Sequence, residues 1–284
     1  MNNAKGWNDL AEMQDDYSNG NNLLLVDGNN LAYRWIQRRN YDSFGDDYIK
    51  TIESLGKSYS AGRIIVCFDF GKSYFRSDMS DDYKSTRKKP KEPEEIAKYE
   101  AFFNCLNATY EDLPFEKMKY RGIEADDLIT YFVEQCKVDH DHTWIVSSDR
   151  DLYQLLDDNV SIFNMFSRRE IDLDYLDEQF EISPDLYLFS RYIEGDKSDA
   201  IFGVEGIGPK RAQALAKEYK TLEALLKALP LKGRSKYIHN LNDSAKLLQK
   251  NEQMINLKRY NKDAILAGKD GEEVWKELQN YVNS

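Results

Sequence analysis

Acidic side chains in four groups along the chain are the residues best suited to carry chemistry. They are Asp27 and Asp69; Glu124, Asp126 and Asp127; Asp149 and Asp151; and Asp196 and Asp199. Carboxylates gathered in one pocket repel one another unless cations neutralise them. Oxygen ligands without histidine or cysteine favour Mg²⁺ or Mn²⁺ over zinc. Two such ions, roughly 4 Å apart, can activate a water and stabilise the leaving oxygen of a phosphodiester.

Each acidic group, taken singly, also has a structural explanation. Aspartate is common at strand ends and turns, and acids at a helix start complement the helix dipole. Three of the candidate strands are each followed by an aspartate, and this repetition favours a shared metal site over separate turns.

The Gly-Ile-Gly-Pro-Lys-Arg segment at residues 206–211 predicts a phosphate-binding hairpin between two helices. Gly206 and Gly208 form a tight turn, and the proline begins the next helix, where its missing N–H costs nothing. Free backbone N–H groups at that helix start bind a phosphate, and Lys210 and Arg211 add positive charge. An ordinary interhelical turn is the alternative.

A basic stretch at residues 83–91 contains five Lys or Arg side chains, including Lys84 and Arg87. Aromatic residues such as Tyr74 and Phe102 lie on either side of it in the sequence. Basic groups beside aromatic rings suit a single strand of nucleic acid, through phosphate contacts and base stacking. The alternative is a solvated charged helix.

The elements that must position these groups follow from hydrophobic patterning. Apolar runs predict strands at residues 23–26, 63–68, 143–146 and 160–163, and the first three precede Asp27, Asp69 and Asp149. Periodic apolar residues predict a helix over 48–59, another beginning near Glu124, and helices from about residue 173 onward. One of these is expected to run through Leu241, Ala245 and Leu248. In open α/β sheets, ligands bind at the carboxyl ends of the strands, so the acids are expected to converge there.

Composition narrows the class of protein. The 284 residues are 41% hydrophobic, which allows one large domain or one domain with a smaller addition. No apolar run is long enough to cross a membrane, and residues 1–21, which are polar and lack signal-peptide features, are expected to form a flexible lead-in. The three dispersed cysteines predict a reducing, cytoplasmic setting. The net charge of −11 argues against a nucleic-acid partner unless basic residues are segregated on the surface.

Six motifs occur in the order typical of the 5′ nuclease or flap endonuclease family, and the chain resembles its phage-encoded members most. They are Asp-Gly-Asn-Asn at 27–30, Phe-Asp at 68–69, Gly-Ile-Glu-Ala-Asp-Asp at 122–127, Ser-Asp-Arg-Asp at 148–151, Gly-Asp-Lys-Ser-Asp at 195–199 and Gly-Val-Glu-Gly-Ile-Gly at 203–208. The resemblance implies a PIN-like α/β core with a mostly parallel sheet over residues 22–180. It also implies a helical arch at about 75–110. The remaining 181–284 would form a helical DNA-binding region, with a helix–hairpin–helix (helix-3-turn-helix) at about 186–220.

The resemblance also implies roles for particular residues. One metal is expected on Asp27, Asp69, Glu124 and Asp126, and a second on Asp149, Asp151, Asp196 and Asp199, with Asp127 contacting the cluster through water. Lys84 and Arg87 match the catalytic Lys and Arg of the arch, which position the scissile phosphate and stabilise charge. DNA contacts are expected from Tyr83, by stacking on a base, and from Lys88, Lys89, Gly206, Gly208, Lys210, Arg211, Arg234 and Lys236. Carbonyls of Val204 and Ile207 are expected to hold K⁺.

The resulting expectation is a monomeric, structure-specific 5′ nuclease that acts in phage DNA replication or repair. It would use two Mg²⁺ or Mn²⁺ ions, act as a 5′-3′ exonuclease and 5′-flap endonuclease, and bind DNA with 5′ flaps, 5′ ends or branched junctions. The alternatives are a non-catalytic DNA-junction binder and a PIN-like RNase or RNA–DNA hybrid nuclease. One departure from the family pattern is Ala200, which follows Asp199 where the family often has Asn and puts a supporting hydrogen bond in doubt.

Overall fold

The protein was analysed as a computed structural model that describes residues 20–38, 40–87 and 90–282. Most of the expected N-terminal lead-in, together with Lys88 and Lys89, lies outside the described residues. Within the described ranges, no helix is both long and apolar enough to cross a membrane.

The centre of the molecule is a six-stranded sheet in the order β3-β2-β1-β4-β5-β6. Its strands are β1 (Asn22–Asp27), β2 (Ala61–Cys67), β3 (Glu116–Met118), β4 (Thr143–Val146), β5 (Val160–Asn164) and β6 (Arg169–Ile171). All neighbouring strands are parallel except β5 and β6. The four predicted strands are confirmed, whereas the short edge strands β3 and β6 were not predicted because neither has an apolar run.

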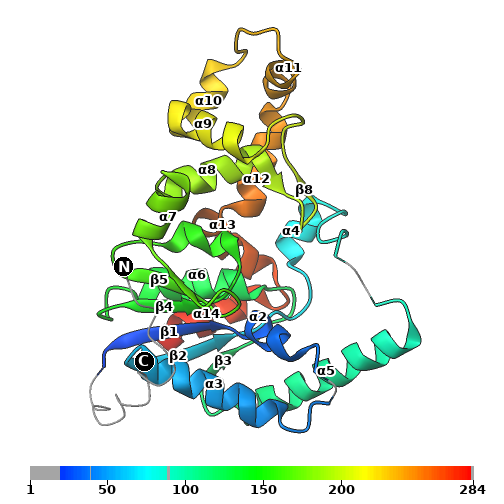
Figure 1. The fold of residues 1–284 in the computed structure, drawn as a ribbon, viewed down its shortest axis with the longest axis vertical. Helices are drawn as coiled ribbons and strands as arrows, with labels where there is room; N and C mark the ends of the chain where they lie inside the picture. The colour runs from blue at the N-terminus through cyan, green and yellow to red at the C-terminus, as the bar shows by residue number, and fades with distance from the viewer. Residues whose placement is uncertain (1–19, 39, 88–89, 283–284) are drawn as a thin grey trace.

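Helices cover both faces of this sheet, as a parallel sheet requires (Figure 1). On one face lie α6 (Ala125–Cys136), α13 (Leu257–Ala267) and α14 (Gly271–Val282), which share a core with Leu23 and Leu25 of β1. On the other lie α2 (Gly28–Ala32), α3 (Phe44–Ser58) and α5 (Pro93–Asp112), whose core includes Leu24 and Val26. The alternation of the β1 side chains between two cores explains why the strand is apolar throughout.

The other helices connect the layers and build the C-terminal region. They are η1 (Tyr33–Trp35), α4 (Tyr74–Met79), η2 (Arg150–Leu155), α7 (Leu173–Phe180), α8 (Pro184–Glu194), α9 (Pro209–Tyr219), α10 (Leu222–Ala228), α11 (Lys236–Asn242) and α12 (Ala245–Ile255). A third apolar cluster packs α8, α9 and α12 together, and the region of α9 to α11 projects away from the sheet (Figure 1). This α/β core with a C-terminal helical region is the predicted fold class.

Two details of the helical region differ from the sequence prediction. Leu241, Ala245 and Leu248 do not share one helix, because α11 ends at Asn242 and Ser244 caps the start of α12. The chain after residue 173 is also interrupted by a small antiparallel pair, β7 (Gly195–Asp196) and β8 (Ile201–Phe202). A short hairpin of this kind has too few residues to produce a periodic pattern.

Candidate active site at the carboxyl edge of the sheet

Asp27 and Asp69 lie at the ends of the neighbouring strands β1 and β2. Asp27 caps α2, where its Oδ1 accepts a hydrogen bond from the Asn30 amide at 3.0 Å, and its Oδ2 accepts one from Ser147 Oγ at 2.9 Å. Asp69 Oδ1 accepts the amide of Ala125 at 2.8 Å, which ties the end of β2 to the start of α6. The strands and the helix start therefore bring these two groups to the same edge.

The other acids approach the same edge from β4 and from the β7–β8 hairpin. Asp149 follows β4, the strand next to β1, and its Oδ1 accepts the amide of Asp151 at 2.9 Å. Asp196 Oδ1 accepts both the amide and the hydroxyl of Ser198, at 2.7 and 2.6 Å, which folds the hairpin around this carboxylate. Asp199 lies at the end of the same turn.

Burial and mutual repulsion raise the pKa of the carboxyls inside this cluster. Burial and the charge of Asp69 raise the pKa of Asp27 to about 7. Burial and the charge of Asp149 raise the pKa of Asp151 to about 7, and raise that of Asp126 well above its usual range. Burial likewise raises the pKa of Asp69 and Asp149. Acids that resist ionisation because of burial and of one another are the groups that a divalent cation would stabilise.

Basic side chains of the expected arch reach into the cluster. Lys84 Nζ lies 2.6 Å from Glu124 Oε1 and 3.8 Å from Asp199 Oδ2, and Arg87 Nη2 lies 2.7 Å from Asp199 Oδ1. Burial opposes the charge of Lys84, but Glu124 and Asp199 outweigh it and raise the pKa of Lys84. The backbone follows the same path, since the Lys84 amide donates to the Asp199 carbonyl at 2.9 Å. The segment 80–87 is therefore closed over the acids.

Arg191, which sequence reasoning did not single out, pairs with two acids of the other half of the cluster. Its Nη2 lies 3.2 Å from Asp151 Oδ1 and 2.9 Å from Asp196 Oδ2. Burial favours neutral Arg191, but Asp151 outweighs it and raises the pKa of Arg191. The Nε of this side chain is buried and has no hydrogen-bond partner in the described part of the chain. The one sequence feature that could have indicated Arg191 was its position on a predicted helix just before Asp196.

Asp127 does not occupy the position expected of a residue that contacts metal through water. It is fully buried, and its two oxygens each lie 2.8 Å from a nitrogen of the Arg76 guanidinium. The Nε of Arg76 donates to the Met254 carbonyl at 2.9 Å. Asp127 thus joins α6 to α4 and to the end of α12, and this correction arises because no sequence pattern pairs it with Arg76.

Tyr83 also differs from expectation. It is 2% exposed, and its hydroxyl donates to Glu124 Oε2 at 2.7 Å, so its ring is not available to stack on a base in this conformation. Glu124 thereby accepts hydrogen bonds from Tyr83, Lys84 and the Ser73 amide. Burial opposes the charge of Glu124, but Lys84, Arg76 and the Tyr83 hydroxyl outweigh it and lower the pKa of Glu124.

The described residues contain no group of three Asp, Glu, His or Cys side chains already arranged to hold a metal ion. Ion pairs with Lys84, Arg87 and Arg191 instead hold four of the acids, Glu124, Asp199, Asp151 and Asp196. The side chains that could bind a metal are nevertheless all carboxylates, so every ligand atom is an oxygen and the group carries a large negative charge. It fits hard divalent cations once these basic side chains move aside.

The hairpin between α8 and α9 has the predicted local geometry. Gly206 has a φ of +85°, a conformation that side chains disfavour, and Gly208 precedes the first turn of α9. The amides of Arg211 and Ala212 turn back to the Gly208 carbonyl, and Arg211 Nη1 donates to the Gly206 carbonyl at 2.8 Å. Lys210 is exposed on the first turn of α9. This end of the helix therefore offers positive charge to solvent.

The remaining predicted residues lie around this hairpin. The Val204 carbonyl accepts the Ile207 amide at 3.0 Å, so one of the two oxygens expected to hold K⁺ also closes the turn. Lys236 is exposed and pairs with Glu205 at 2.7 Å, and Arg234 is exposed nearby in sequence. Both lie on the α10–α11 side of the projecting region, as an extended duplex surface would require.

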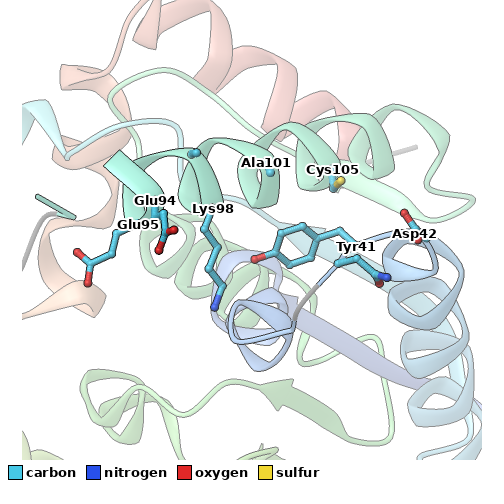
Figure 2. A pocket seen from close by; sticks show the side chains of 9 residues that line it. Tyr41, Asp42, Glu94, Glu95, Lys98, Ala101 and Cys105 are labelled. Carbon is cyan, nitrogen blue, oxygen red and sulfur yellow. The ribbon is translucent and has the colours of Figure 1, made fainter. Parts of the chain in front are cut away.

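A well-defined hollow of the described structure lies away from the acids. It measures about 830 Å³ and lies between α5 and the loop of Tyr41 and Asp42 (Figure 2). Glu94 and Glu95 line it together with Lys98. No acid of the cluster lines this hollow, so we assign the chemistry to the sheet edge from its carboxylates, not from the shape of the surface.

Together, the fold and the site define a metal-dependent nuclease with an α/β core and a helical region for binding nucleic acid. A family described as "5′-3′ exonuclease, N-terminal resolvase-like domain" matches residues 22–181, and one described as "5′-3′ exonuclease, C-terminal SAM fold" matches residues 182–265. The chain belongs to the 5′-3′ exonuclease family.

Individual relatives agree with this assignment. The flap endonuclease of Escherichia phage T5 is 38% identical over 271 residues, which cover 93% of each chain. A 5′-3′ exonuclease of Bacillus subtilis is 30% identical, and the match covers 75% of each chain.

Solved structures show the same likeness. A crystal structure of the phage T5 flap endonuclease, described as a pseudo-enzyme-product complex with DNA and metal ions, matches with a TM-score of 0.87 and 37% identity. That match covers 93% of this chain and 100% of the other. A structure of the T5 5′-exonuclease with bound zinc matches with a TM-score of 0.86 and 38% identity, over 92% of this chain and 99% of the other.

Proposed function

We propose that this protein cuts DNA at 5′ flaps, 5′ ends and branched junctions, by hydrolysing phosphodiesters with two divalent cations. The observation that carries the proposal is the meeting of four acidic groups at one sheet edge, beside Lys84 and Arg87. The fold and the likeness to the T5 flap endonuclease support it.

The residues proposed to hold the cations are the acids that share this edge. Asp27, Asp69, Glu124 and Asp126 would form one site, and Asp149, Asp151, Asp196 and Asp199 the other. When bound, the cations would activate a water and stabilise the leaving oxygen. We favour Mg²⁺ or Mn²⁺ because every donor is an oxygen, although a relative has been solved with zinc.

The basic side chains that now neutralise the acids would become available to the substrate. With cations bound to the acids, Lys84 would no longer be needed to neutralise Glu124, nor Arg87 to neutralise Asp199, and both side chains would be able to bind the scissile phosphate. Aimed at the phosphate oxygens, they stabilise the negative charge that develops in the transition state. The same two side chains thus have an electrostatic partner in both the free and the bound enzyme.

Duplex DNA would be held by the hairpin. The start of α9 would contact DNA through the backbone of Gly206 and Gly208 and the positive charge of Lys210 and Arg211. The same surface is extended by Arg234 and Lys236. Val204 and Ile207 would supply carbonyls to a K⁺ ion. Asp196 and Asp199 lie in the β7–β8 segment, which leads directly to the turn at Gly206 and Gly208. The fixed separation between the acids and the duplex-binding turn would therefore set where the DNA strand is cut.

We also propose that the protein acts as a monomer in the cytoplasm, which would be that of the host cell if a phage encodes it. All three cysteines are free thiols, which suits a reducing compartment.

The test is cleavage of a DNA duplex with a single-stranded 5′ flap, with an RNA flap of the same sequence as the comparison. Cleavage near the junction in Mg²⁺ or Mn²⁺, its loss in EDTA and its loss in Asp149→Asn are the expected results. Tight flap binding without cleavage in either metal would overturn the proposal in favour of a junction-binding protein. Faster cleavage of the RNA flap would favour an RNase.

A further inference from the structure

Two lysine side chains, one on the edge strand β3 and one just after it, lie against aromatic rings of neighbouring segments. Lys117 Nζ lies 4.9 Å from the ring centroid of Tyr110. Lys119 Nζ lies 4.9 Å from the same centroid and 5.5 Å from that of Phe70. Lys117 belongs to β3 and Lys119 comes just after its last residue, Met118, and both lie on the side of the Tyr110 ring. The resulting series, Lys117–Tyr110–Lys119–Phe70, ends at the residue that directly follows Asp69 in the chain.

Phe70 is fixed in this place by its backbone. It forms a parallel bridge with Arg121, and the Gly122 amide donates to the Phe70 carbonyl at 2.9 Å. A second aromatic side chain stands on the same segment, since a Cβ on Gly122 would lie 2.7 Å from the Tyr74 ring. Residues 121–122, which lead directly to Glu124, are therefore held by the Phe70 backbone and lie against the Tyr74 ring.

Both rings remain open to solvent even though they are well anchored. Phe70 is 47% exposed and Tyr74 is 39% exposed, and Arg121, which forms the parallel bridge with Phe70, is exposed as well. Neither ring contributes to the apolar clusters of the described core. An exposed aromatic ring next to lysine and arginine has the two chemical features that bind single-stranded nucleic acid, a stacking surface and positive charge.

We propose that Phe70 stacks on the base of an unpaired nucleotide next to the scissile phosphodiester, with Lys119 and Arg121 contacting the adjoining backbone. The inference rests on the proposed function, because it assumes a DNA strand at the carboxylates. It adds a stacking position outside the arch segment, on the β2 and β3 side of the site. Stacking there would hold the strand in place while leaving the base sequence unread, because every base has a stacking face.

The experiment uses the full chain in EDTA, where a metal-dependent nuclease binds without cutting. Flap duplexes carry 2-aminopurine, or an abasic site, at each of the two nucleotides flanking the junction. We expect the wild-type protein to quench 2-aminopurine at one of these positions. Phe70→Ala should lose that quenching and bind about tenfold more weakly, whereas Phe70→Trp should retain both. The abasic site should weaken the wild type by about the same factor and leave Phe70→Ala unaffected.

The matched control is Val138→Ala, an exposed apolar residue just after the far end of α6, which should behave as wild type. Equal quenching and affinity in wild type and Phe70→Ala would overturn the inference. So would an abasic site that weakens both proteins equally. If wild type cuts the flap in Mg²⁺ while either of these results holds, the inference fails and the proposed function stands. If wild type neither binds nor cuts the flap, both fail.

Discussion

At the scale of single residues, Glu124 is the most heavily bonded acid of the site. Its oxygens accept from Tyr83, Lys84 and the Ser73 amide, and it lies 3.4 Å from Arg76. A carboxylate this well satisfied gives up a donor only to a stronger partner, such as a divalent cation. Lys84 is the donor with most freedom to leave, because it is a flexible side chain with the phosphate as its alternative partner.

Replacing Lys84 should separate binding from catalysis. We expect Lys84→Ala to slow single-turnover cleavage of a 5′-flap DNA by about 10²- to 10³-fold, the usual loss when a group that stabilises the transition state is removed. Flap binding in EDTA should change only slightly, since the hairpin supplies most duplex contacts. Lys91→Ala, an exposed lysine in the same stretch, serves as the control. An unchanged rate in Lys84→Ala would remove this residue from the mechanism.

At the scale of elements, the two halves of the molecule are joined by buried polar contacts. Arg76 links α4 to α6 and to the Met254 carbonyl. Asn251 Nδ2 donates to the Tyr192 and Phe202 carbonyls at 2.8 and 2.9 Å, and so fixes α12 to α8 and β8. Buried polar groups of this kind are costly to leave unpaired. The contacts of Arg76 and Asn251 therefore hold the duplex-binding turn before α9 at a set distance from the acids.

The first turn of α9 gives a test of the hairpin. Lys210→Gln should weaken binding to duplex DNA and reduce the slope of log K against log salt by about 0.9, the value for one phosphate contact. The cleavage rate with saturating enzyme should stay the same, because Lys210 lies away from the acids. Lys220→Gln, at the opposite end of the helix, is the matched control. Identical salt slopes for both variants and wild type would contradict a phosphate contact at Lys210.

At the scale of the whole molecule, the carboxylate cluster makes stability depend on pH and on metal. Asp27 and Asp151 have pKa values near 7 in the folded chain, compared with 3.8 for the free groups. The folded protein therefore binds more protons than the unfolded chain between about pH 4 and pH 7. The free energy of unfolding falls as pH rises through this window, and the loss is complete above about pH 7.

Thermal melting checks whether the protein becomes less stable as the pH rises. In EDTA the melting temperature should be several degrees higher at pH 5.5 than at pH 8, and Mn²⁺ should raise it more at pH 8, where the acids are ionised. His142 opposes the trend because burial lowers its pKa. Asp27→Asn isolates the carboxylates, and should raise the metal-free melting temperature at pH 8 while reducing the stabilisation by Mn²⁺. A metal-free melting temperature that rises from pH 5.5 to 8 would contradict the prediction.

The sequence by itself determined the features that local patterns encode. Apolar runs ending at Asp27, Asp69 and near Asp149 located three strand ends, and parallel pairing then required these acids to share an edge. Gly206 and the Gly-Pro pair after Ile207 located the hairpin, because their conformational preferences act within a few residues. The family resemblance added roles for the acids and for Lys84.

Only the tertiary structure decided which charged groups meet. The partners of three ion pairs are each separated by about 40 residues or more along the chain. These pairs are Arg76 with Asp127, Lys84 with Glu124, and Arg191 with Asp151. No periodicity or turn signal specifies such a pair, because the interaction depends on distance in space after the helices have packed. For the same reason the burial of Tyr83, and the exposure of Phe70 beside Lys119, could be learned only from the folded chain.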